Sequence, residues 1–161
     1  MRIGHGYDAH RFCENKDLII GGIKIKYEKG LLAHSDGDVL VHAYMDAILG
    51  AAGERDIGTF FPDSDMTYEG ADSCKLLEKV ISVIKSKGLT IEYADMTIIA
   101  QKPKMAEYLF LMREKLSEIS EISIERLNIK ATTEEKMGFT GRLEGISAHS
   151  VVLLNEKETD E

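Results

Sequence analysis

Apolar residues recur at the spacing of an α-helix in two long segments of the chain, residues 36–52 and 72–87. Positions i, i+3 and i+4 share one face of a helix, so this recurrence predicts two helices that pack against a core. Ser35 or Asp36 can cap the first helix, and Gly88 follows the second as a carboxyl-terminal cap. The apolar positions are Val39, Leu40, Ala43, Ala47 and Leu49 in the first helix and Leu76, Leu77, Val80, Ile81 and Ile84 in the second.

A third helix and several strands complete the pattern. Pro103 suits the first turn of a helix, whose apolar face would comprise Met105, Leu109, Met112, Leu116 and Ile119. Residues 18–27 predict two short strands around Gly21-Gly22, a dipeptide typical of hairpin turns. Further strands are predicted at residues 1–10, 89–101, 127–132 and 146–154.

The order of these elements indicates the fold class. Strands and helices alternate irregularly, which favours an α/β sandwich, an α+β arrangement in which helices pack on one face of a mixed sheet. Neither internal repeats nor low-complexity segments interrupt the chain, so we expect a single domain over residues 1–155. Residues 156–161 are almost all charged or small, and we expect them to form a frayed tail.

Composition and charge narrow the possible functions. The chain has 161 residues, of which 43 % are hydrophobic and 30 % charged, as in ordinary globular proteins. Its 28 acidic and 20 basic residues give a net charge of −8, which argues against binding to nucleic acid or to an anionic membrane surface. The same charge would repel a phosphorylated substrate, so any phosphate chemistry needs cations supplied locally.

Targeting and redox signals point to the cytoplasm. No stretch approaches the roughly 20 consecutive apolar residues of a membrane span, and the first ten residues lack the apolar region of a secretory signal. Cys13 and Cys74 are too few and too far apart for a disulfide framework. We therefore expect reduced thiols in a cytoplasmic protein.

Three side chains near the amino end have the chemistry of a metal site. Asp8 and His10 are two residues apart, so in an extended segment both point to the same face. His42, on the first predicted helix, could supply a third ligand. Two imidazoles and one carboxylate suit Zn²⁺, and three protein ligands leave a position open for a substrate. The alternative is a chance pairing of an aspartate with a histidine.

Four other segments are rich in polar groups. Residues 33–42 place His34 and Ser35 at a helix start, where free N–H groups can bind an anion, although a capped turn with solvated carboxylates is the alternative. Residues 56–65 could cover a substrate or simply form a loop with an aromatic core plug. The polar groups of residues 100–105 and 130–145 could contact phosphate, a nucleotide or Mg²⁺, or form ordinary polar loops.

Taken in order, these segments resemble the 2-C-methyl-D-erythritol 2,4-cyclodiphosphate synthase family. The resemblance spans residues 1–145 and rests on MRIGHGYDAHRF, EKGLLAHSDGDVLVHA, GERDIGTFFPDSD, GADS, MTIIAQKPKM and IKATTEEKMGFTGR. It implies a phosphorus–oxygen lyase of the non-mevalonate isoprenoid pathway. That reaction is an intramolecular phosphoryl transfer that converts 4-diphosphocytidyl-2-C-methyl-D-erythritol 2-phosphate into the cyclic diphosphate and CMP.

The resemblance also implies residue roles. Asp8, His10 and His42 would hold zinc, and Glu135 would hold a second ion, Mg²⁺ or Mn²⁺, although the adjacent Glu134 leaves that ligand ambiguous. The catalytic stabilisers of the transition state would be His34 and Thr133. The substrate would contact Ser35, Asp56, Ile57, Gly58, Phe61, Pro62, Asp63, Ser64, Asp65, Thr132, Phe139 and Arg142. The cytidine nucleotide would contact Ala100, Gln101, Lys102, Pro103, Lys104, Met105 and Ala106.

Assembly follows from the same resemblance. It implies a homotrimer whose active sites are shared, with zinc held by one subunit and the cytidine pocket supplied by the next. Leu143, where glycine is common in the family, changes the rim expected near the trimer axis. Two alternative functions stay open at this point: a zinc-dependent phosphoester hydrolase, and a non-catalytic module that binds isoprenoid diphosphates.

Overall fold

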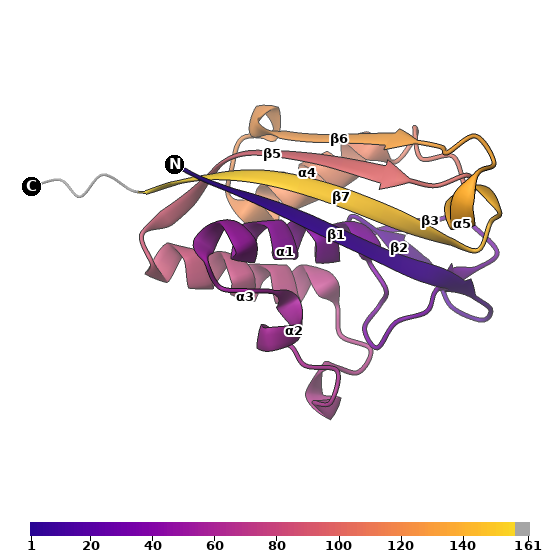
Figure 1. Ribbon diagram of the computed structural model, residues 1–161, viewed down its shortest axis with the longest axis horizontal. Helices are drawn as coiled ribbons and strands as arrows, with labels where there is room; N and C mark the ends of the chain where they lie inside the picture. Colours follow the sequence, from indigo (N-terminus) through magenta and orange to yellow (C-terminus); the bar gives the residue numbers. More distant parts are fainter. Residues whose placement is uncertain (157–161) are drawn as a thin grey trace, which may run out of the picture.

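A twisted sheet with helices on one face forms the body of the computed structural model, which describes residues 1–156 (Figure 1). The sheet has five strands in the order β4-β1-β7-β5-β6 among these residues. β5 and β6 run parallel, whereas the other neighbours run antiparallel, so the mixed sheet is confirmed. The strands are β1 (Arg2–Cys13), β4 (Gly30–Leu31), β5 (Leu89–Ile99), β6 (Leu127–Thr132) and β7 (Gly145–Glu156).

Three longer helices cover one face of this sheet (Figure 1). α1 (Val39–Ala52) packs directly against the sheet, with most of its residues buried. α3 (Ser73–Ser86) packs beside α1, and α4 (Leu109–Ser120) packs against α3 and β6. The predicted hairpin at 18–27 is present as β2 (Leu18–Ile20) and β3 (Ile23–Ile25). Shorter helical turns are α2 (Ile57–Phe60), η1 (Met66–Tyr68), η2 (Ile124–Arg126) and α5 (Gly138–Gly141).

The start of α1 differs from the prediction. The residue that caps the helix is Asp38, not Ser35 or Asp36. The fully buried Asp38 carboxylate accepts hydrogen bonds from the N–H groups of Val41, Gly21 and Gly22, so it joins the helix start to the β2–β3 turn. Burial, together with the nearby Asp36, raises the pKa of Asp38 to about 6, although the three N–H groups oppose this.

The start of α4 was also predicted wrongly. The helix begins at Leu109 rather than at Pro103. Residues 101–108 instead form bends and a turn, in which the N–H of Tyr108 donates to the carbonyl of Met105. Met105 is buried from this irregular segment rather than from the helix.

The remaining predicted elements agree closely with the structure. α3 ends one residue before the expected position, and Gly88 follows it with a φ of +68°. β1 extends to Cys13, and β7 runs from Gly145 to Glu156, whose side chain pairs with Arg2 at 3.0 Å. The rest of the predicted tail, residues 157–161, lies outside the described residues. No helix within residues 1–156 is long and apolar enough to cross a membrane.

Two glycines let α1 lie directly on β1. A Cβ atom added at Gly4 would lie 2.0 Å from the carbonyl oxygen of Ala47, and one added at Gly6 would lie 1.8 Å from that of Ala43. Both distances are far below a van der Waals contact, and the obstructing atoms belong to the helix backbone. The pair therefore sets the close approach that brings the first turn of α1 to the residues following Gly6 on β1.

Gly6→Ala is expected to destabilise the protein by about 3 kcal/mol or more, because a backbone carbonyl cannot move aside cheaply. The free energy of unfolding in urea measures this change. Gly50→Ala is the matched control, since an added Cβ there meets no atom within 4 Å of the described structure and alanine favours the helix by about 0.5–1 kcal/mol. Equal stability of the two variants would contradict the packing described here.

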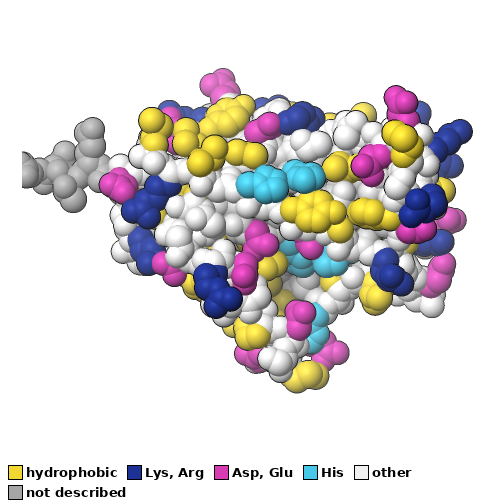
Figure 2. All heavy atoms as spheres, viewed as in Figure 1, with side chains coloured by type: hydrophobic (Ala, Val, Ile, Leu, Met, Phe, Trp, Pro, Cys, Tyr) yellow, Lys and Arg dark blue, Asp and Glu magenta, His cyan; other side chains and the backbone are white. Residues whose placement is uncertain are grey.

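The opposite face of the sheet carries no helix among the described residues. It presents apolar and histidine side chains in alternate positions of β1, β7 and β5, and Figure 2 shows these yellow and cyan side chains together on the face toward the viewer. Exposure is 74 % for Ile3, 47 % for Tyr7, 43 % for Tyr93 and 41 % for Val151. Such a broad apolar face is typical of an interaction surface.

Candidate active site

The structure brings the three predicted metal ligands together. Asp8 and His10 project from the same face of β1, just beyond the two glycines, and His42 reaches them from the first turns of α1. The Oδ2 atom of Asp8 lies 2.7 Å from Nε2 of His10 and 3.0 Å from Nδ1 of His42. The two imidazole nitrogens are 3.2 Å apart. One ion could therefore contact all three atoms.

The donor set fits zinc. In a tetrahedral zinc site, ligand atoms at about 2.0 Å from the ion lie about 3.3 Å from one another, close to the separations observed here. The other carboxylate oxygen of Asp8 accepts the N–H of Ala9 at 2.9 Å, which leaves Oδ2 to face the histidines. A carboxylate and two imidazoles form a common zinc donor set, and the fourth position would face the pocket.

Electrostatics within the triad favour the charged carboxylate. Burial alone would raise the pKa of Asp8, but hydrogen bonds from His10 and His42 lower it well below its ordinary value. Burial alone would lower the pKa of His42, but its hydrogen bond with Asp8 outweighs this and raises it. The carboxylate is thus in the state that a metal requires at neutral pH.

A pocket of about 380 Å³ opens beside the triad. Beyond the three ligands, the predicted residues that line it are His34, Ser35, Ile57, Gly58, Phe61 and Asp63. The Nε2 atom of His34 is buried and has no hydrogen-bond partner within residues 1–156. Because an unpaired buried polar group is costly, this atom is suited to bind a polar group of a ligand.

A second pocket, of about 410 Å³, lies at the end of β5 and β6. It is lined by most of the predicted nucleotide segment together with two predicted phosphate contacts; these residues are Ala100, Gln101, Pro103, Lys104, Met105, Ala106, Thr132 and Thr133. The two pockets share no lining residue. Within one chain, therefore, the candidate metal site and the candidate nucleotide site are separate.

The loop after β6 treats its two adjacent glutamates differently. The carboxylate of Glu134 accepts a short hydrogen bond, 2.5 Å, from the hydroxyl of Thr140 at α5. The exposed side chain of Glu135 makes no hydrogen bond or ion pair with any described residue. Glu135 has a positive φ of +51°, and its N–H donates to Thr133 Oγ1 at 3.2 Å. Both residues are exposed, but the loop engages the carboxylate of Glu134 and leaves that of Glu135 without a partner among the described residues.

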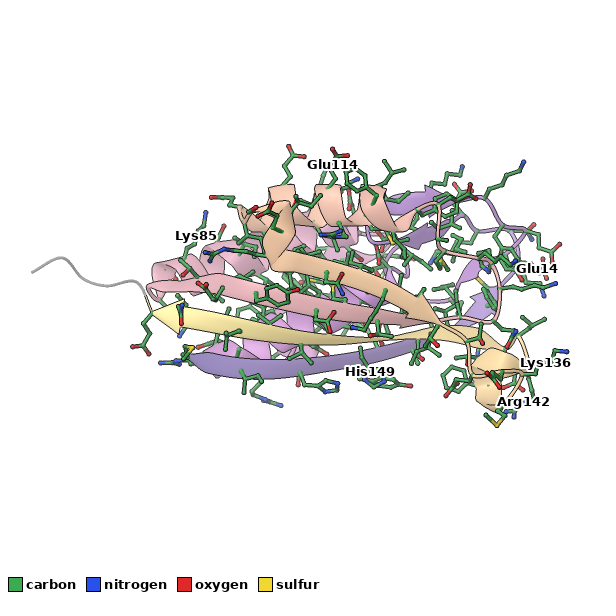
Figure 3. The ribbon with its side chains drawn as sticks, turned by 90° about the horizontal axis from the view of Figure 1, so that it is seen from above. Glu14, Lys85, Glu114, Lys136, Arg142 and His149 are labelled. Carbon is green, nitrogen blue, oxygen red and sulfur yellow. The ribbon has the colours of Figure 1, made fainter. Side chains whose placement is uncertain are left out.

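Gln101 joins this loop to the nucleotide segment. Its side-chain oxygen accepts the N–H of Lys136 at 2.9 Å, so the two predicted binding segments are directly linked. Figure 3 shows Lys136 and Arg142 at the same end of the sheet, far from Lys85. Arg142 pairs there with Glu144 at 2.9 Å.

Some predicted residues do not line either of these two pockets; they are Asp56, Pro62, Ser64, Asp65, Lys102, Glu135, Phe139 and Arg142. Asp56 and Asp65 cap α2 and η1. Phe139 lines a third pocket that borders His10. Conversely, sequence reasoning missed four residues of the first pocket: Ala33, Met45, Tyr68 and Leu76. The sequence pattern identified Leu76 only as part of the apolar face of a helix, and no pattern in the sequence singled out Tyr68.

Comparison with known proteins decides the family. The sequence profile of the YgbB family matches residues 1–155. The chain belongs to the YgbB family. Its YgbB relatives include 2-C-methyl-D-erythritol 2,4-cyclodiphosphate synthase from Pelobacter propionicus, which is 58 % identical over 154 residues, 96 % of this chain and 98 % of the relative. The family resemblance inferred from the sequence is therefore confirmed.

Solved structures agree with this YgbB assignment. The bifunctional IspDF of Campylobacter jejuni is 41 % identical with a TM-score of 0.93, and the match covers 96 % of this chain and 42 % of that longer one. IspF of Plasmodium falciparum, solved as a CDP complex, is 35 % identical with a TM-score of 0.86 over 98 % of this chain and 97 % of that one.

Proposed function

We propose that this protein is a 2-C-methyl-D-erythritol 2,4-cyclodiphosphate synthase of isoprenoid biosynthesis. The substrate would be 4-diphosphocytidyl-2-C-methyl-D-erythritol 2-phosphate, and the products the 2,4-cyclodiphosphate and CMP. The observation that carries the proposal is the convergence of Asp8, His10 and His42 in one pocket with His34, whose Nε2 atom has no partner among the described residues. The chain that holds them is 58 % identical to a named synthase over 96 % of its length. Neither a hydrolase nor a non-catalytic binding module is favoured by these relatives.

The reaction forms one bond and breaks one. An oxygen of the 2-phosphate bonds to the β-phosphorus, while the bond from that phosphorus to the oxygen bridging to the α-phosphate breaks and its electron pair leaves with CMP. This makes the enzyme a phosphorus–oxygen lyase. The attacking oxygen is already ionised, so no strong general base is needed, and positioning with charge stabilisation supplies the catalysis.

Two metal sites fit the proposal. Asp8, His10 and His42 would hold Zn²⁺, and Glu135, rather than Glu134, would hold Mg²⁺ or Mn²⁺, because the Glu134 carboxylate already binds Thr140. When bound, zinc would orient the phosphates and polarise the attacked phosphorus, and the second ion would neutralise charge on the leaving CMP.

The chain's own groups would position the substrate and stabilise the transition state. His34 would donate from its free Nε2 to a phosphate oxygen, and Ser35 would bind beside it. Thr133 would donate a hydroxyl to the transferring phosphoryl group from the second pocket. The methylerythritol portion would lie against the rest of the first pocket, along the segments 56–58 and 61–65. Phe139 and Arg142 would complete the site at the subunit boundary.

The second pocket would bind the cytidine nucleotide. Residues 100–106 would surround the base and ribose, with Lys104 near the diphosphate and Thr132 continuing the phosphate site. The relative from Plasmodium falciparum was solved with CDP, which supports a cytidine nucleotide as part of the substrate.

We further propose a homotrimer with shared active sites. No described residue covers the apolar face of the sheet. Figure 3 shows that His149 lies on this face and points away from the helices, which pack on the opposite face. Since the two pockets are separate within one chain, a neighbouring copy would bring its cytidine pocket to this chain's metal site.

We also propose a single domain and a cytoplasmic location. The match of the family model to residues 1–155 supports one domain. The free thiols of Cys13 and Cys74 support a cytoplasmic location.

Phosphorus NMR of a reaction with the diphosphocytidyl substrate tests the proposed activity. We expect resonances of a cyclic diphosphate and of CMP in equal amounts. Release of inorganic phosphate without a cyclic product would replace the synthase by a hydrolase, and binding without turnover would indicate a non-catalytic module.

Removal of divalent metal should abolish turnover. After treatment with a chelator and its removal, we expect CMP release to fall at least about 100-fold, because Lys104 and Arg142 alone would leave most of the charge on the substrate's phosphates unneutralised. Adding Zn²⁺ and Mg²⁺ together should restore the rate. Full activity in protein shown by elemental analysis to be metal-free would contradict the proposed metal centre.

A further inference from the structure

We infer that Ser73 and Asp36 position His42 for metal binding by fixing which of its ring nitrogens carries the proton. The inference rests on the proposed zinc site and adds two positioning residues to it. Neither residue contacts the three ligand atoms that face one another in the triad.

A chain of hydrogen bonds leads from the triad to these residues. The Nδ1 atom of His42 faces Asp8 and His10, whereas its Nε2 atom lies 3.0 Å from the Oγ atom of Ser73. The Oγ atom of Ser73 lies 2.5 Å from the Oδ1 atom of Asp36, and the other oxygen of Asp36 accepts the N–H of Ser73 at 3.0 Å.

The direction of this chain follows from the number of protons. An ionised carboxylate can only accept, so the single hydroxyl proton of Ser73 is donated to Asp36. The Oγ atom of Ser73 must then accept the proton on Nε2 of His42. When a metal replaces the Nδ1 proton that His42 shares with Asp8, the lone pair of the neutral imidazole is thus on Nδ1, the atom that faces the other two ligands. A metal-bound histidine is commonly oriented in this way through its second nitrogen.

The position of Ser73 makes the arrangement rigid. It is the first residue of α3 and is fully buried, with no exposed surface. The segment that carries Asp36 is joined to the start of α3 by backbone hydrogen bonds, from Gly70 N to His34 O at 2.7 Å and from Asp36 N to Ala71 O at 3.1 Å. The relay therefore connects the zinc ligand to the same loop that presents His34 and Ser35 to the substrate.

Ser35 offers a second, weaker acceptor. Its Oγ atom lies 3.1 Å from Nε2 of His42 but also accepts the N–H of Gly37 at 3.3 Å. Because Ser35 can partly replace Ser73, loss of Ser73 should weaken zinc binding without abolishing it.

Zinc affinity of the full-length protein, measured by competition with a chromophoric chelator, tests the inference. Ser73→Ala should weaken zinc binding about tenfold, and kcat at saturating zinc should return to within about threefold of the wild-type value. Asp36→Ala should weaken zinc binding in the same direction, since Ser73 would then be free to turn its proton toward His42.

Asp72→Ala is the matched control. Asp72 caps α3 beside Ser73, accepting the N–H of Cys74, but does not contact His42, so its loss should leave zinc affinity within about twofold. Wild-type zinc affinity in Ser73→Ala, or an equal loss in Asp72→Ala, would overturn the relay while leaving the zinc site intact. Failure of the wild-type protein to bind zinc would instead overturn the proposed metal centre itself.

Discussion

Replacing His42 with alanine is expected to lower kcat/KM for the diphosphocytidyl substrate by at least about 10³-fold. His42 supplies one of three converging ligand atoms, 3.0 Å from the Asp8 carboxylate, and its loss leaves two ligands that cannot hold zinc against water. The variant should also contain little zinc after purification. Steady-state release of CMP and elemental analysis of the protein measure the two effects.

Metal-free wild-type protein is the matched control for this variant. Both should be equally inactive, but added Zn²⁺ should restore only the wild-type protein. Turnover that survives in His42→Ala at a rate near that of the wild type would show that zinc is not required for the chemistry.

Glu135→Gln is expected to lower kcat by about 10²-fold and to raise the Mg²⁺ concentration needed for half-maximal activity. The Glu135 carboxylate extends from a loop held by the Gln101–Lys136 bond and has no partner among the described residues, so the amide variant removes a metal ligand without removing a structural contact. Titration of activity with Mg²⁺ and with Mn²⁺ measures the effect.

Glu134→Gln is the control one residue away. A glutamine oxygen can still accept the hydroxyl of Thr140, so activity should stay within about threefold of the wild-type value. If Glu134→Gln loses activity and Glu135→Gln does not, Glu134 is the metal ligand and the loop must rearrange when the ion binds.

Most of the fold could be predicted from the pattern of apolar residues, because α3 buries one continuous face, β5 buries alternate residues, and α1 is buried along nearly its whole length. The helix cap of α1 was predicted wrongly because contacts with residues distant in the sequence determine it. Asp38 caps α1, and its carboxylate is held by the hairpin turn, which lies 16 and 17 positions away. The carboxylate of Asp36 lies outside the helix and binds Ser73, 37 positions away. No local pattern contains either contact.

Part of the candidate metal site could also be predicted from a local pattern. Alternation along a strand puts Asp8 and His10 on one face, and this rule needs no tertiary information. The close approach of α1, which brings His42 to them, depends on Gly4 and Gly6, whose role only the packing reveals. The separation of the two pockets was likewise invisible to reasoning from the residues alone.

The acidic balance of the chain also has a structural meaning. Several carboxylates are engaged by other groups of the fold: Asp8 faces the histidines, and Asp38 and the exposed Asp56 cap helices. In the proposed site, bound metal, Lys104 and Arg142 would supply the cationic groups that a phosphorylated substrate needs. This arrangement accounts for an enzyme of net charge −8 that acts on an anionic substrate.

A crystal structure of the protein with Zn²⁺ and CDP would test the central claim most directly. We predict anomalous zinc density bounded by Asp8, His10 and His42, and a cytidine held by residues 100–106 of a neighbouring copy, with its diphosphate directed at that zinc. Two results would contradict the shared active site on which the proposed cyclisation depends. One is zinc at the triad with cytidine bound only beyond the reach of any triad, and the other is a triad without zinc.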